Sequence, residues 1–132
     1  MSYKNVILIT GARDWTCHST ISTQLSSFPH NESTLLIHGD CVGADKISGK
    51  IARQLGFIVS ASPADWKKYG RAAGPIRNQQ MVKEALTYAN AGIDTVVLAF
   101  HDDLTQSKGT KNCVEYATKQ GLDIIIAGSD EL

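Results

Sequence analysis

Short apolar runs alternate with segments of helical periodicity along most of the chain. Residues 5–10 and 34–38 are continuous apolar runs in which polar side chains do not alternate with apolar ones. Such runs indicate strands that are buried on both faces of a sheet. Three further strands are expected at residues 57–60, 94–100 and 123–126.

Helices are expected between these strands, where apolar side chains recur every three or four residues. Gly56 and Gly121 each follow such a segment, as is typical of helix ends. The expected helices are a Ser- and Thr-rich one ending near residue 27 and those at residues 44–55, 75–90 and 109–120.

This alternation predicts right-handed βαβ units in an α/β fold, with a doubly wound parallel five-stranded sheet and helices on both faces. The simplest strand order is 3-2-1-4-5, in a single domain that covers residues 1–132. In that order the winding reverses between the first and fourth strands, and ligands bind at the carboxyl ends there. The loops that reach this point are residues 11–15, 39–45 and 101–110, and each contains glycine and polar side chains.

The segment 70–81 carries the most specific chemical pattern. Pro75 fits the first position of the third helix, which places Arg77 and Asn78 in its opening turn beside unpaired amides. A helix start that carries arginine is suited to bind phosphate, although a solvated arginine on a capped helix would give the same pattern. If Arg77 binds phosphate, Arg77→Ala should cost about 1.5–3 kcal/mol of binding and leave the melting temperature unchanged.

The preceding segment, residues 61–74, is expected to be a loop of about 14 residues, a length at which loops tend to be functional or disordered. Trp66 and Tyr69 argue against disorder. Trp66 could stack on a base, but the size of its side chain slightly favours the simpler role of pinning the loop to the core.

Several loop residues have both a structural and a functional interpretation. Arg13 and Asp14 could form a surface ion pair or contact a ligand. Asp45 could bind a ligand or simply favour the start of its helix. His38, at the end of the second strand, is more typical of a core histidine than of a catalyst.

Composition narrows the function classes. The formal net charge is zero, from thirteen basic and thirteen acidic residues, so nothing attracts nucleic acid or a membrane generally. The three cysteines are far apart and in no metal-ligand spacing, so reduced thiols, no metal and no cofactor are expected. No apolar run reaches the roughly 20 residues of a membrane span, and the N-terminus lacks a signal-peptide pattern. We therefore expect a cytoplasmic protein.

Neither GxGxxG nor GxxxxGK[ST] is present, which excludes the usual dinucleotide fingerprint and the NTPase P-loop. Four other motifs carry a resemblance: TGARDW, HGDCVGAD, PADWKKYGRAAGPIRNQQM and SKGT. Together they resemble the YspA-like branch of the SLOG superfamily, which is related to the "lonely guy" phosphoribohydrolases and to a DNA-processing protein that loads single strands. The resemblance implies a Rossmann-like fold that binds a nucleotide or a nucleotide derivative.

The resemblance to the phosphoribohydrolases is incomplete at the catalytic positions. Arg77 and Met81 match their R-K-x-x-M segment, and Gly109–Thr110 match the GT of PGGxGTxxE. The catalytic Glu of that second motif corresponds to Cys113, which cannot stabilise oxocarbenium-like charge. A carboxylate would have to come from another loop, at Asp14, Asp45, Asp102 or Asp103.

The sequence therefore predicts a sensor or sequestering module for a nucleotide-derived (phosphoribosyl) ligand. An N-glycosidase acting on nucleoside 5'-monophosphates is the alternative, with Arg77, Asp14 and Asp45 as its catalytic candidates. Single-stranded nucleic acid binding is a third reading, which zero net charge and few aromatic residues count against. Relatives often dimerise, and the sequence leaves the oligomeric state open. The expected ligand-binding residues are Gly11, Arg13, Gly39, Asp40, Gly43, Ala44, Trp66, Arg71, Gly74, Asn78, Met81, Lys108, Gly109 and Thr110.

Overall fold

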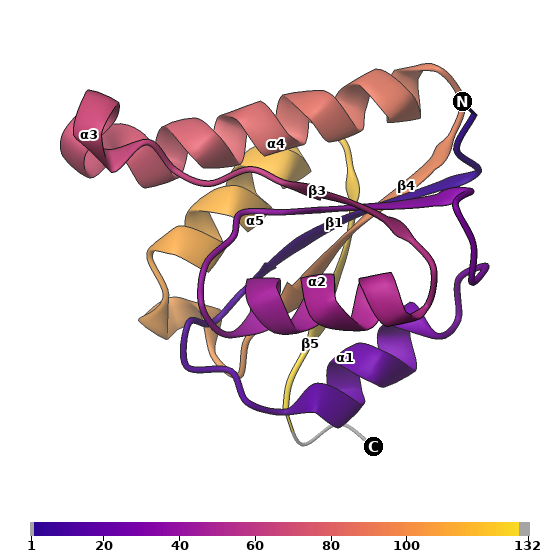
Figure 1. Cartoon of the computed structure of the whole chain (residues 1–132). Helices are drawn as coiled ribbons and strands as arrows, with labels where there is room; N and C mark the ends of the chain where they lie inside the picture. The colour runs from indigo at the N-terminus through magenta and orange to yellow at the C-terminus, as the bar shows by residue number, and fades with distance from the viewer. Residues whose placement is uncertain (1, 130–132) are drawn as a thin grey trace.

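Five parallel strands form one twisted sheet in the computed structural model, which describes residues 2–129 (Figure 1). The spatial order is β3-β2-β1-β4-β5, with every neighbouring pair parallel, so the predicted doubly wound α/β fold and its strand order are confirmed. The strands are β1 (Asn5–Gly11), β2 (Thr34–His38), β3 (Ile58–Ala61), β4 (Asp94–Phe100) and β5 (Asp123–Ala127).

Helices cover both faces of the sheet, and alternate residues of β1 pack against helices on opposite faces (Figure 1). Ile7 and Ile9 pack into a core on the side of α1 (His18–Leu25) and α2 (Ala44–Gln54). Val6 and Leu8 pack into a second core on the side of α4 (Ala73–Asn90) and α5 (Gly109–Lys119). Because both faces of β1 are buried, its side chains are apolar without alternation. Among residues 2–129, no helix combines the length and the apolar character that a membrane crossing requires.

The segment 61–74 is more ordered than the sequence suggested. It contains a helical turn, α3 (Trp66–Tyr69), and a 3-10 turn, η1 (Gly70–Ala72), which leads directly into α4. Asp65 caps α3, since its Oδ1 accepts a hydrogen bond from the Lys68 amide at 3.1 Å. Within this segment only residues 62–65 belong to no strand or helix, so the prediction of a loop across the whole segment was wrong. A second 3-10 turn, η2 (Leu104–Gln106), interrupts the loop after β4.

The start of α4 also differs from the prediction. The helix begins at Ala73, two residues before Pro75, so Arg77 is its fifth residue and lies in the second turn. Proline, which has no N–H, is tolerated at any position of the first turn because none of the first four amides has a partner within the helix. Pro75 therefore indicates the first turn of α4 but not its first residue. The unpaired amides of the α4 start are therefore not beside Arg77 and Asn78.

Candidate functional site

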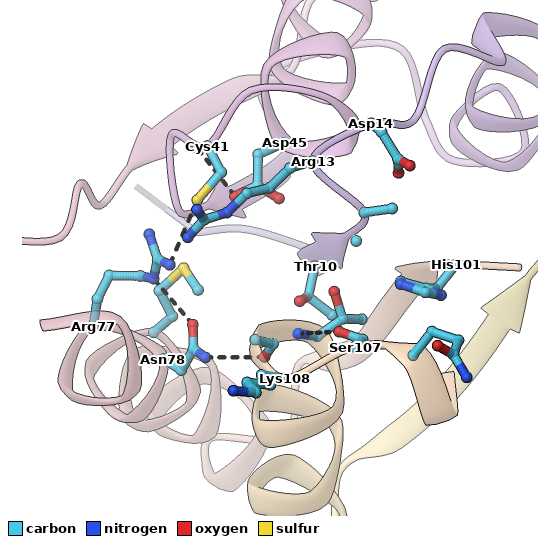
Figure 2. A pocket seen from close by; sticks show the side chains of 16 residues that line it. Thr10, Arg13, Asp14, Cys41, Asp45, Arg77, Asn78, His101, Ser107 and Lys108 are labelled. Atoms are coloured by element: carbon cyan, nitrogen blue, oxygen red, sulfur yellow. Dashed lines mark hydrogen bonds between the residues drawn. The ribbon is translucent and has the colours of Figure 1, made fainter. Parts of the chain in front are cut away.

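An open cleft of about 580 Å³ lies at the carboxyl ends of β1 and β4, where the winding of the sheet reverses (Figure 2). The cleft is lined from several elements: the loop after β1 (residues 12–17, the β1 loop), the loop after β2 (residues 39–43, the β2 loop), the loop after β4 (residues 101–108), α4, and the starts of α2 and α5. This is the position at which doubly wound sheets bind ligands. The lining residues are Thr10, Gly11, Ala12, Arg13, Asp14, Cys41, Asp45, Arg77, Asn78, Met81, His101, Gln106, Ser107, Lys108, Gly109 and Thr110.

The loop after β1 is attached to the start of α2 by close backbone packing. The Ala44 amide donates to the Ala12 carbonyl at 3.1 Å. Gly43 has a φ of 83°, and a Cβ there would lie 2.4 Å from the carbonyl oxygens of both Ala12 and Arg13. A Cβ on Gly11 would lie 2.5 Å from that of Ala44. The glycines of these loops are thus required by contacts within the protein. Gly43 and Ala44 stand behind the wall of the cleft rather than on it.

Arg77 is buried at one side of the cleft and connects α4 to the β2 loop. Its Nη1 donates to the Gly39 carbonyl, its Nε to Asn78 Oδ1 at 3.0 Å, and its Nη2 to Cys41 Sγ at 3.6 Å. Gly39 gives the guanidinium its space, because a Cβ there would lie 2.5 Å from Nη1. Only 7% of Arg77 is exposed. Arg77 therefore has a structural role in addition to any contact with a ligand. This differs from the expectation that Arg77→Ala would leave the melting temperature unchanged.

Asn78 continues this network from α4 to α5. Its amide nitrogen donates to the Gly109 carbonyl at 3.3 Å and to Asn112 Oδ1 at 3.1 Å, while its oxygen accepts from Arg77. Each of its polar atoms already has a protein partner. Asn78 therefore positions Arg77 and the start of α5. Direct contacts with a ligand would come from the neighbouring side chains.

Asp45 is the buried carboxylate of the cleft. Its Oδ2 accepts hydrogen bonds from the amides of Gly39 at 2.9 Å and Cys41 at 3.4 Å, so it stabilises the β2 loop. Burial raises its pKa to about 6, against the opposing effects of these amides and of the Arg77 guanidinium. Among the described residues Oδ1 has no hydrogen-bond partner. Asp45 can therefore take up and release a proton near neutral pH at the wall of the cleft.

The start of α5 offers the cleft backbone donors and a cation. Ser107 Oγ accepts from the Thr110 amide at 3.0 Å, which leaves the amides of Gly109 and Lys111 without partners among residues 2–129. Gly109 is exposed and lines the cleft, and a Cβ at this position would have nothing within 4 Å. Lys108 is exposed at the same point (Figure 2). Unpaired amides, the positive end of a helix dipole and an ammonium group together favour an anion.

Arg13 and Asp14 are exposed on the β1 loop and line the cleft. Within residues 2–129 no ion pair joins them, so the surface-pair interpretation finds no support. Arg13, Arg77 and Lys108 thus contribute three cationic groups from three separate elements to one cleft (Figure 2).

Seven expected ligand-binding residues lie outside this cleft: Gly39, Asp40, Gly43, Ala44, Trp66, Arg71 and Gly74. Asp40 forms an exposed ion pair with Lys46 at 3.1 Å, and Gly74 lies near the edge of the Trp66 ring, where a Cβ would be 3.6 Å from Cη2. Arg71 is exposed on η1. Trp66 is 51% exposed, so the idea that it pins its loop to the core was wrong. Gly39 is also buried behind the cleft, beneath Arg77.

The other acid–base candidates are either hydrogen-bonded to protein groups outside the cleft or buried. Asp102 accepts from the amide and hydroxyl of Ser129, and Asp103 caps η2 through the Thr105 amide. Cys113 is completely buried, and burial raises its pKa to about 11. His38 is buried too, with Nδ1 accepting from the Asp40 amide. Among the candidate carboxylates, the cleft therefore receives only Asp14 and Asp45.

Thr10, Cys41 and His101 line the cleft but were not among the site residues expected from the sequence. Each lies at or just after the carboxyl end of a strand, and the rule that located the cleft would have named them. His101 accepts from the Asp103 amide at Nδ1, at 3.0 Å, which leaves Nε2 available to a ligand. Within residues 2–129, no group of His, Cys, Asp and Glu side chains has the arrangement of a metal site.

Comparisons of the sequence with known proteins found a matching family and a relative. The sequence model of the YspA, cpYpsA-related SLOG family matches residues 5–69, which run from β1 to α3. The Gene 61 protein of Mycobacterium phage D29 is 37% identical over 129 residues, covering 92% of this chain and 95% of the phage protein. No solved structure matches the chain significantly.

Proposed function

The chain belongs to the YspA, cpYpsA-related SLOG family, and on that premise we propose that its cleft binds a phosphorylated, nucleotide-derived ligand. Membership of the family suggests a ligand related to nucleotides. The protein would act as a sensor or sequestering module, and we place it in the cytoplasm.

One observation carries the proposal: Lys108, Gly109 and Thr110 at the start of α5 line the cleft, and the amides of Gly109 and Lys111 have no partner among residues 2–129. A phosphate there would accept hydrogen bonds from the Gly109 and Lys111 amides and interact with the helix dipole. Arg13 and the remaining N–H groups of Arg77 would add charge-assisted hydrogen bonds. The sugar would lie against Met81 and Thr10, beside Asp45.

The test is calorimetric titration with ribose 5-phosphate, and with ribose as the uncharged control. The proposal expects ribose 5-phosphate to bind and ribose to bind far more weakly. Lys108→Ala should weaken binding about 5- to 30-fold, because the loss of one interaction with a charged group costs about 1–2 kcal/mol. Lys119→Ala makes the same charge change at the other end of α5 and should have no effect. Equal affinities for ribose and its phosphate would contradict the proposal.

A second function, N-glycosidic hydrolysis, is favoured by Asp45 alone. Hydrolysis would add water across the bond between base and ribose, releasing free base and ribose 5-phosphate. A carboxyl group with a pKa of about 6 in the wall of the cleft has the properties of an acid–base catalyst. Cys113 cannot replace the missing Glu because it has no exposed surface. We therefore expect slow base release or none.

Incubation with nucleoside 5'-monophosphates, followed by chromatography for free base, separates the two functions. Robust release that disappears in Asp45→Asn, with ribose 5-phosphate binding retained, would make the protein a hydrolase. Asp14→Asn is the matched variant, because Asp14 lines the same cleft but is exposed. Release that depended on Asp14 instead would assign the catalytic carboxylate to the β1 loop.

A further inference from the structure

A second pocket of about 400 Å³ adjoins the cleft on the side of β3 and α3. Arg13, Cys41 and Arg77 line both cavities, so these three side chains form the boundary between them. Beyond that boundary the lining changes in character. The cleft has charged groups and helix amides, whereas the far wall of the second pocket consists mainly of Val42, Pro63, Ala64 and Trp66.

Two of these apolar side chains are unusually exposed. Val42 is 59% and Trp66 51% exposed, and they come from separate segments, the β2 loop and α3. Among residues 2–129 the other exposed large apolar side chains are Ile125 and Ile126, on the distant edge strand β5. Large apolar groups that converge on one pocket at the surface are typical of a binding site.

The backbone that carries Trp66 is held in place although the side chain is half exposed. The cap by Asp65 holds the first turn of α3, and Cη2 at the edge of the ring lies 3.6 Å from the position that a Gly74 Cβ would take. An indole held in this way presents a flat apolar surface at little entropic cost to a ligand. Nucleobases bind such surfaces by stacking, because every base has a π face.

We propose that this second pocket is the base subsite of the ligand, with the base stacked on Trp66 and covered by Val42. The inference rests on the proposed function, and it narrows the ligand from a sugar phosphate to an intact nucleotide. The ligand would extend from the start of α5, where its phosphate lies, past Arg13 and Arg77 to Trp66. The polar cleft and the apolar pocket would match the polar and aromatic halves of one molecule.

Two probes test the base subsite separately from the phosphate site: the four common ribonucleoside 5'-monophosphates, and ribose 5-phosphate, which lacks a base. At least one nucleotide should bind more tightly than ribose 5-phosphate. Trp66→Ala should weaken binding of that nucleotide about 5- to 150-fold, the range expected for one lost base–aromatic stack. The same variant should bind ribose 5-phosphate as the wild type does. Trp66→Phe, which keeps a stacking ring, should recover most of the loss.

Fluorescence gives an independent readout because the chain has two tryptophans, and the other, Trp15, is 5% exposed. A stacking nucleotide should change the emission of the wild type but not that of Trp66→Phe. Ile125→Ala removes an exposed apolar side chain far from the pocket and should alter neither affinity.

The possible failures are distinguishable. If ribose 5-phosphate binds, but no nucleotide binds more tightly or Trp66→Ala weakens none of them, the base subsite is refuted and the phosphate site stands. If neither kind of probe binds, the proposed function itself fails, and the inference with it.

Discussion

Replacing Asp45 by Asn should make the protein more stable at neutral pH, although Asp45 accepts two hydrogen bonds. An Asn side-chain oxygen can still accept from the Gly39 and Cys41 amides, as Asp45 Oδ2 does. What the substitution removes is a negative charge on a side chain that is 5% exposed. Burial of that charge is the main reason why the pKa of Asp45 is raised from 3.8 to about 6.

The sign and size of the effect follow from this shift. Because the folded state holds its proton more tightly than the unfolded state, Asp45 is stabilising below about pH 4, and that stability is lost as the pH rises to about 6. A shift of about two pKa units corresponds to about 3 kcal/mol. Asp45→Asn should therefore resemble the wild type near pH 4 and exceed its free energy of unfolding by up to about 3 kcal/mol at pH 7.

The assay is urea unfolding of both proteins at several pH values between 4 and 8. Only the difference between the two curves matters, because the other titrating groups are common to both. Asp14→Asn, at an exposed position in the same cleft, should change the free energy of unfolding at pH 7 by less than about 0.5 kcal/mol. The reasoning is refuted if the wild type is the more stable protein at pH 7 and its advantage shrinks as the pH falls. That result would mean that attraction to the Arg77 guanidinium and the two amide hydrogen bonds outweigh the effect of burial on the Asp45 charge.

Two further substitutions test the network and the loops. Arg77→Ala should lower the free energy of unfolding by about 2–4 kcal/mol, because it leaves the Gly39 carbonyl without its buried donor. It should also weaken ribose 5-phosphate binding. Unchanged stability in urea unfolding would contradict the structural role. Gly43→Ala should cost about 3 kcal/mol or more, since it adds backbone clashes to a strained φ of 83°. Gly92→Ala, with a φ of 87° but nothing within 4 Å, should cost only about 1–2 kcal/mol, and equal losses would show that the packing of the β1 loop against α2 is unimportant.

The fold was predictable because its signals are local. The apolar runs of β2 and β4 and the end of α4 at Asn90 follow from periodicity and from the turn residues beside them. The first residue of α4 could not be predicted in this way, because proline is tolerated throughout a first turn. The preceding residues, from Trp66 to Ala72, are themselves helical.

The position of the cleft was predictable, but the contacts of each side chain in it were not. The reversal of winding located the cleft, and the loops expected there do meet in it. That Arg77 is buried, that Asn78 uses every polar atom on protein partners, and that Trp66 is exposed depend on contacts between distant segments. A single sequence does not reveal such contacts, since the same residues suit both a solvated and a buried position.

The central claim is that the start of α5 holds the ligand's phosphate, and a titration followed by amide NMR tests it most directly. Adenosine 5'-monophosphate is added to the ¹⁵N-labelled chain, and each amide is followed as the ligand saturates. The account predicts the largest shifts at the Gly109 and Lys111 amides, with ribose 5-phosphate reproducing them and adenosine failing to do so. Shifts that are absent, or that leave Gly109 and Lys111 unmoved while other surfaces respond, would contradict it.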